Sequence, residues 1–159
     1  MEEKLKKNLK RRIDELRKIG IVISDELTPE SKIRGIYGFF AKTKSDEFCF
    51  YIGKATDIVA RLIGKNSHLN NYLRGVRNTY VLQDVEKYLT SGFSIEIKVL
   101  QEVKFIGDSF EKDANRLALA ELQELVYYQN KGECDNQLSE AVKEKYERKT
   151  WNRIFSTTK

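Results

Sequence analysis

Two aromatic runs within residues 35–61 constrain the fold of this chain more than any other feature. The first run, 35–40, reads GIYGFF and the second, 48–53, reads FCFYIG; both have the apolar, aromatic composition of buried β-strands. The residues between them, KTKSDE at 42–47, are polar and turn-forming, which favours a short connection. The segment therefore predicts a β-hairpin.

A short helix is expected directly after the second strand. Thr56 is a residue type that caps helix N-termini, and Asp57 would lie in the first turn, where the helix dipole favours an acid. A helix over 57–63 then places Arg61 four residues after Asp57, on the same helix face.

The words GIY at 35–37 and YIG at 51–53, followed by Lys54 and Arg61, resemble the GIY-YIG nuclease family. That family includes homing endonucleases, some type II restriction enzymes and the N-terminal domain of the bacterial excision-repair nuclease. The resemblance extends over residues 34–137 and implies an α/β (α+β) fold, with a small three-stranded antiparallel sheet flanked by helices. A buried hairpin whose tyrosines only pack would explain the aromatic residues, but not the Gly-Lys-Ala turn or the arginine.

The residues of these two words fit the chemistry of phosphodiester hydrolysis. That reaction needs an activated water and stabilisation of charge on the phosphoryl and leaving oxygens. Tyr37 and Tyr51 are candidate general bases if neighbouring cations lower the phenol pKa, which is ordinarily near ~10. Lys54 could lower that pKa or bind phosphate, and the planar fork of Arg61 matches a phosphate group. Which tyrosine would act as the base stays open at this point.

The resemblance also implies a carboxylate on the longest helix that holds a divalent cation, Mg²⁺ or Mn²⁺. Glu124 fits the family pattern best, because apolar aromatic residues follow it three and four positions later and Asn136 lies twelve residues on. Glu121, one turn earlier, is the alternative. By resemblance, Asn136 would steady the site through hydrogen bonds, and His68 is a further candidate because several family members have a histidine near the site. A single carboxylate with water completing the coordination shell suits Mg²⁺.

Length and composition set the broad class of protein. With 159 residues and 40% hydrophobic content, the chain suits one domain, 1–159, with one core. No apolar run approaches the ~18 residues of a membrane span and the N-terminus is charged, so we expect a soluble, cytoplasmic protein. Cys49 and Cys134 are too few for a disulfide framework, and one histidine with two cysteines offers no structural zinc site.

Positive charge gathers at the two ends of the chain. Residues 1–20 hold eight Lys or Arg against four acids, and residues 141–159 hold six against two, although the net charge is only +5. Basic ends around a near-neutral middle suit DNA as a partner. Solvated helix faces would give the same composition.

Helical segments are expected at both ends of the core. Residues 1–20 predict a basic amphipathic helix whose apolar face carries Leu5, Leu9, Ile13 and Leu16. That face must pack on the domain core or on a second copy of the chain, which allows a homodimer. Residues 21–32 are interpreted as a linker, and 138–159 as a C-terminal helical extension.

The remaining elements follow from periodicity. Residues 64–90 predict two short helices, which we interpret as an insertion, and 93–99 alternates apolar and polar residues as a half-buried strand does. Residues 113–131 predict the longest helix, ending at Gly132.

Four basic residues are candidates for contacts with the DNA backbone. Arg74 and Arg77 lie in the insertion, and Lys10 and Arg11 lie on the polar face of the N-terminal helix.

Together these features favour a divalent-metal-dependent DNA endonuclease. A compact chain with a catalytic core at 34–137 and no appended DNA-reading domain is typical of a type II restriction enzyme. A structure-specific, homing or repair-type nuclease of the same family is one alternative. A nucleic-acid-binding module that has kept the scaffold and lost the reaction is another.

Overall fold

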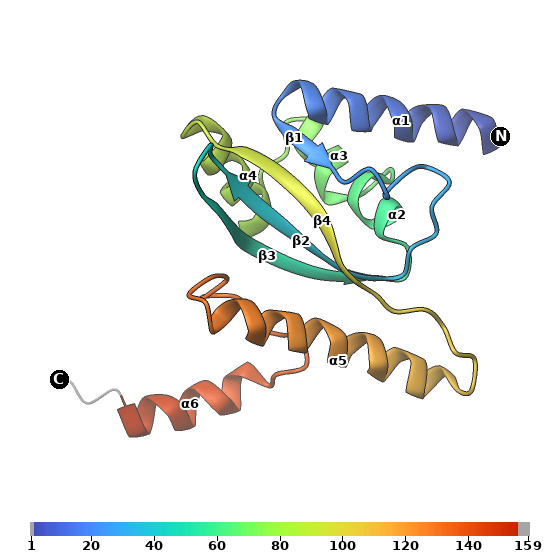
Figure 1. Cartoon of the computed structure of the whole chain (residues 1–159). Helices are drawn as coiled ribbons and strands as arrows, with labels where there is room; N and C mark the ends of the chain where they lie inside the picture. Colours follow the sequence, from blue (N-terminus) through green and yellow to red (C-terminus); the bar gives the residue numbers. More distant parts are fainter. Residues whose placement is uncertain (1, 156–159) are drawn as a thin grey trace.

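The computed structural model describes residues 2–155, which form a four-stranded sheet with helices on both faces (Figure 1). The strands are β1 (Ile21–Ile23), β2 (Gly35–Lys42), β3 (Glu47–Ala55) and β4 (Ser94–Glu102). Their order across the sheet is β1-β4-β2-β3, so the predicted hairpin of β2 and β3 lies at one side and β3 is an edge strand. The α+β class is confirmed.

The sheet differs from the expected three antiparallel strands by one strand. β4, β2 and β3 are mutually antiparallel as predicted, but β1 pairs with β4 in parallel, Ile21 opposite Ile95. The interpretation of residues 21–32 as a linker is therefore wrong for the first three residues, which form β1. Ile21 and Ile23 are buried and Val22 is exposed, so this short strand does alternate, but three residues give too little periodicity to be recognised.

Helices α1 (Glu2–Lys18), α2 (Ile58–Ile63), α3 (His68–Leu73) and α4 (Tyr80–Thr90) cover one face of the sheet (Figure 1). Their apolar side chains share a core with Tyr37 and Phe39 of β2. Helix α5 (Phe110–Gln129) covers the other face and packs on Ile36 and Ile52. Because side chains alternate along a strand, β2 and β3 contribute to two separate cores.

The N-terminal helix packs on its own domain. Leu9 and Leu16 are buried and Ile13 packs against the core, whereas Leu5 is 54% exposed. The predicted apolar face is therefore mostly used within the chain, and it leaves little surface for a second copy.

Two helix starts differ from the sequence prediction. Asp57, not Thr56, is the N-cap of α2, and its carboxylate accepts a hydrogen bond from the backbone N–H of Ala60. Helix α5 begins three residues earlier than expected, because Ser109 caps it. It also ends two residues before the predicted 131, at Gln129, and Gly132 follows in the left-handed conformation (φ 80°).

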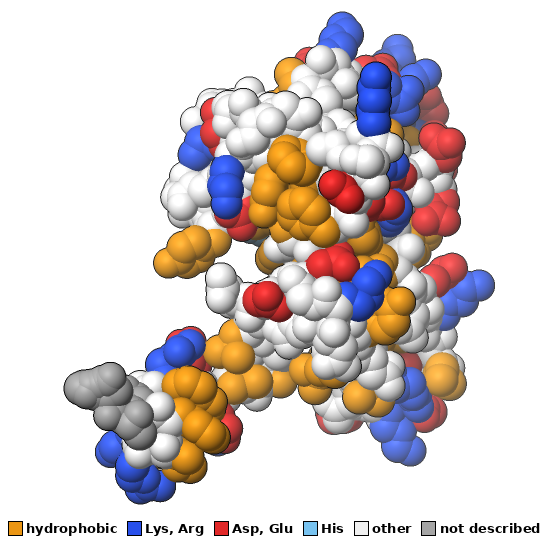
Figure 2. Space-filling model, turned by 60° about the vertical axis from the view of Figure 1, so that its left-hand side comes forward, with side chains coloured by type: hydrophobic (Ala, Val, Ile, Leu, Met, Phe, Trp, Pro, Cys, Tyr) orange, Lys and Arg blue, Asp and Glu red, His pale blue; other side chains and the backbone are white. Residues whose placement is uncertain are grey.

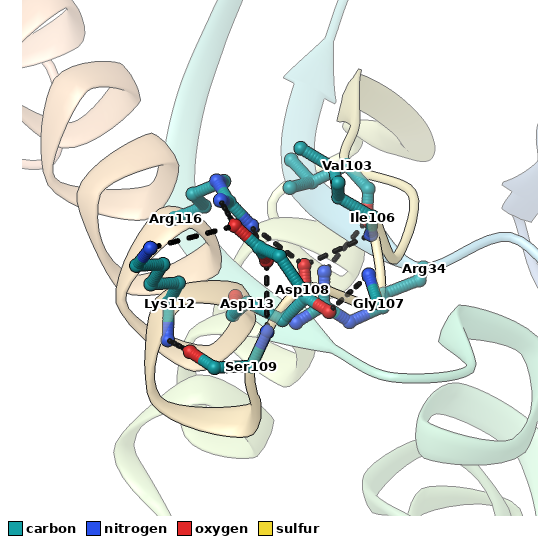
Figure 3. Close-up of polar contacts among 9 residues, drawn as sticks. All are labelled: Arg34, Val103, Ile106, Gly107, Asp108, Ser109, Lys112, Asp113 and Arg116. Atoms are coloured by element: carbon teal, nitrogen blue, oxygen red, sulfur yellow. Dashed lines mark hydrogen bonds and ion pairs between the residues drawn. The ribbon is translucent and has the colours of Figure 1, made fainter.

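A buried polar cluster fixes the start of α5 against the sheet (Figure 3). Arg34 donates from one guanidinium nitrogen to the carbonyl of Val103 (2.8 Å) and from another to the carbonyl of Asp113 (2.9 Å). The Asp113 carboxylate in turn accepts from the backbone N–H groups of Ile106 (2.9 Å) and Gly107 (3.0 Å). These bonds tie the loop after β4 to the first turn of α5, and they set which face of α5 meets the sheet.

Helix α6 (Glu144–Phe155) extends away from the rest of the molecule (Figure 1). None of its described residues is buried, and Trp151, Ile154 and Phe155 form a hydrophobic strip on it (Figure 2). Among residues 2–155, no helix has both the length and the apolar character that crossing a membrane requires.

Candidate active site

The candidate site lies at the edge strand β3, where elements from both faces of the sheet meet. Tyr51 points to the face covered by α1–α4, and Lys54 points to the face covered by α5. Tyr37 of the neighbouring strand lies beside Tyr51, with ring centroids 6.4 Å apart. Arg61 of α2 acts electrostatically on both phenols, and so does Glu121 of α5. Five side chains that are far apart in sequence therefore gather at one edge.

Gly53 explains why a glycine follows the second tyrosine. It pairs with Tyr37 across the hairpin, and a Cβ atom at this position would overlap the Cζ and Oη atoms of Tyr37. Only glycine leaves room at this position for the end of the Tyr37 ring and its hydroxyl.

Both phenols have a pKa above that of free tyrosine. Burial raises the pKa of Tyr37, the neighbouring Tyr51 raises it further, and the guanidinium of Arg61 opposes both effects. Burial likewise raises the pKa of Tyr51, again against the charge of Arg61. An additional cation at the site would act in the same direction as Arg61 and favour the phenolate.

The carboxylate at this site is Glu121, and the preference for Glu124 is not supported by the geometry. Glu121 is only 9% exposed and its Oε1 lies 3.4 Å from Nζ of Lys54. Glu124 lies one turn further along, and its charge raises the pKa of Tyr128, on another part of α5. Within residues 2–155, no ion pair joins Glu124 to Lys54 or to Arg61. Of the two acids proposed from sequence, the alternative is the one that the fold brings to the tyrosines.

Lys54 lies between two carboxylates, one of which the sequence did not indicate. Its Nζ is 3.3 Å from Oε2 of Glu140, in the segment before α6, as well as 3.4 Å from Glu121. Burial lowers the pKa of Lys54, but Glu121 and Glu140 outweigh that effect and raise it. Glu140 falls in the segment expected to be a C-terminal helix, and nothing in the sequence singled it out; in the structure it lies just before α6.

His68 is brought to the site, as the resemblance implied. It is the first residue of α3, and it lines the same groove as Tyr51. Burial lowers its pKa and the charge of Arg61 lowers it further, so the imidazole is neutral at pH 7. A neutral imidazole can accept or donate a hydrogen bond near the phenols.

The residue that braces β3 is Gln137, one position after the predicted Asn136. Its Oε1 accepts from the backbone N–H of Ile52 (3.0 Å), and its Nε2 donates to the carbonyl of the same residue (2.6 Å). Gln129 of α5 donates to the Gln137 carbonyl (2.9 Å), which connects this loop to the helix. Asn136 is exposed and makes no side-chain hydrogen bond within residues 2–155. The bracing role expected for Asn136 therefore belongs to Gln137.

Replacing Gln137 by alanine is expected to destabilise the protein by about 2 to 4 kcal/mol. The substitution leaves the N–H and C=O of the buried Ile52 without their partners on an edge strand, and each unpaired group carries a desolvation cost. Urea unfolding followed by circular dichroism measures the change. Asn136→Ala is the matched control and should leave the midpoint within error; equal loss in the two variants would contradict the assignment.

The candidate DNA contacts are placed unequally. Arg77 is held within the fold, because its guanidinium donates to the carbonyl of Tyr72 (2.7 Å) and stacks 3.4 Å from the centroid of that ring. It is therefore a structural residue, contrary to the prediction. Arg74, Lys10 and Arg11 are exposed and free to reach a backbone, although Arg11 also pairs with Glu15 at 3.5 Å.

Glu121 is the residue that would hold a divalent cation. No cluster of three or more His, Cys, Asp or Glu side chains exists in the described part of the chain, so a cation held here would take most of its ligands from water. Burial raises the pKa of Glu121 despite the charge of Lys54, so this carboxylate is incompletely compensated. A hydrated Mg²⁺, which needs few protein ligands, fits such a position.

Comparisons of the chain with protein-family models, with curated proteins and with solved structures gave no match.

Proposed function

We propose that the protein is a divalent-metal-dependent DNA endonuclease of the GIY-YIG type. The observation that carries the proposal is the gathering of Tyr37, Tyr51, Lys54, Arg61 and Glu121 at the edge of β3. A buried hairpin that only packs would not need a guanidinium and a buried carboxylate beside its two phenols. Phosphodiester hydrolysis needs these groups together.

Each side chain has a task in the proposed reaction. Arg61 holds the scissile phosphate through paired N–H donors, since its side chain is exposed at the edge of the site. Tyr37 accepts the proton of the attacking water, because its hydroxyl is fixed over Gly53 and experiences the charge of Arg61. As the bond from water oxygen to phosphorus forms, the bond from phosphorus to the leaving sugar oxygen breaks, and solvent protonates that oxygen.

Lys54, Glu121 and His68 complete the set. When bound at Glu121, a divalent cation supplies Lewis-acid stabilisation of the leaving oxygen. Lys54 adds a second positive charge near the phosphate and the phenols. His68, neutral, orients water through a hydrogen bond.

Arg61→Ala is expected to lower the cleavage rate about a hundredfold, the usual cost of one transition-state donor. The assay follows nicking of supercoiled plasmid with Mg²⁺, and EDTA should abolish it. Arg153→Ala is the matched control, since it removes another exposed arginine near a helix end, on α6 and away from the site. A parent protein that binds plasmid and never nicks it would instead indicate a binding module that has lost the reaction.

A further inference from the structure

A groove of about 860 Å³ continues from the candidate site along the outer side of β3. One wall comes from α4, another from the loop at 132–138, and the floor from β3. Tyr51 and His68 line the end of the groove that meets the site. Figure 2 shows hydrophobic side chains around a hollow on this side of the molecule. Whatever occupies the groove therefore lies next to the reacting group.

Aromatic rings form much of the lining of this groove. Phe48 and Phe50 pack on Tyr88, with ring centroids 5.3 and 4.8 Å apart, and all three are only partly buried. Tyr80, the first residue of α4, is 89% exposed at the rim. No contact within the described residues accounts for an aromatic side chain placed so openly beside other rings. Such rings are stacking surfaces for flat ligands.

The charges around the groove select which part of a nucleic acid can enter. Asp84 and Asp135 line it, against Lys87 alone among the lysines and arginines of the lining; a third acid, Glu133, is already paired with Lys131. This balance repels phosphate, but carboxylates accept hydrogen bonds from the exocyclic amines of cytosine and adenine. The groove thus suits bases, while Arg61 outside it suits the backbone.

We infer that this groove binds unpaired nucleobases next to the scissile phosphate, so the substrate is DNA with a locally single-stranded segment. The inference rests on the proposed function, since the scissile phosphate is placed at Arg61. A base that is paired within a duplex presents no free face to Phe50, Tyr80 or Tyr88. Cleavage at a flap or junction follows, in preference to cleavage within a continuous duplex.

Binding measured without cleavage tests the inference. Fluorescence anisotropy in EDTA compares a labelled duplex with the same duplex carrying a three-nucleotide 5′ or 3′ single-stranded flap. We expect at least about tenfold tighter binding of one flap substrate, and a loss of about tenfold for Tyr80→Ala on that substrate alone, the range for one stacked base. Tyr146→Ala removes another highly exposed tyrosine, on α6 and outside the groove, and should change neither affinity.

Equal affinity of the parent for flap and duplex would overturn the inference, as would a Tyr80→Ala variant that keeps the full preference. The nicking assay is independent of this measurement. A parent that prefers the flap but never cleaves would refute the nuclease reaction and leave the base-binding groove in place. A parent that cleaves continuous duplex with no preference for the flap would support the nuclease reaction and refute the base-binding groove.

Discussion

Exchanging Glu121 for glutamine is expected to lower Mg²⁺-dependent DNA cleavage about a thousandfold, which corresponds to about 4 kcal/mol of transition-state stabilisation. Glutamine keeps the size of the side chain and removes the charge that would hold a hydrated cation. The substitution removes the Lys54–Glu121 ion pair of 3.4 Å, but Lys54 keeps Glu140 at 3.3 Å, so stability should change little by comparison with activity. Initial nicking rates over a range of Mg²⁺ concentrations measure both the rate and the apparent metal affinity.

Glu124→Gln is the matched control for this experiment, because it changes the same residue type one turn along the same helix. Its cleavage rate should stay within about twofold of the parent, since Glu124 faces Tyr128. Glu140→Gln tests whether the other carboxylate beside Lys54 holds the cation instead of Glu121. Glu140 also pairs with Lys54, but its side chain is exposed. If Glu124→Gln were inactive and Glu121→Gln active, the placement of the cation would be wrong.

Local signals in the sequence were enough to predict the hairpin and the short helix after it that carries Arg61. Aromatic strands, a polar turn and a capped helix are encoded by neighbouring residues, so their prediction needs no knowledge of distant contacts. The short span from Tyr51 to Arg61 leaves few ways to connect strand and helix. The fold also gives a reason for Gly53 that spacing alone could not supply, namely the ring of Tyr37 packed against it.

The residues placed wrongly were those whose position depends on distant contacts. Glu121 and Glu124 are both plausible on an amphipathic helix; Glu121 turns toward β3 because it lies between Leu117 and Leu125, which pack on the sheet. Helical periodicity shows that a helix has faces, but not which distant strand each face will meet.

Loops carry even less information about register. Asn136 and Gln137 are both amides in a turn, and the choice between them depends on the path of the backbone through Cys134, a residue with a φ of 55°. Non-glycine residues seldom adopt that conformation, so no sequence rule would assume it. Short or irregular segments likewise lack a recognisable pattern. For that reason Glu140 was missed, and β1, only three residues long, was interpreted as a linker.

Tyr37→Phe is expected to lower the cleavage rate about a thousandfold at pH 7.5, within the range for loss of a general base. The phenyl ring still fills the space over Gly53 in a core position that is 1% exposed, so circular dichroism and the unfolding midpoint should match the parent closely. The rate of the parent should also depend on pH. Burial, followed by Tyr51, raises the pKa of Tyr37, so the reactive phenolate is a minor form near neutrality.

Below the pKa, each unit by which the pH rises multiplies the fraction of phenolate by about ten, so the parent rate should rise about tenfold per unit between about pH 7 and 9. Tyr37→Phe should lose this slope, whereas Tyr51→Phe should keep it at a lower overall rate. If the slope vanished in Tyr51→Phe and persisted in Tyr37→Phe, the two phenols would exchange roles. Tyr51, which is partly exposed and lines the groove, would then be the general base. The stacked nucleobase and the attacking water would in that case enter the site through the same groove.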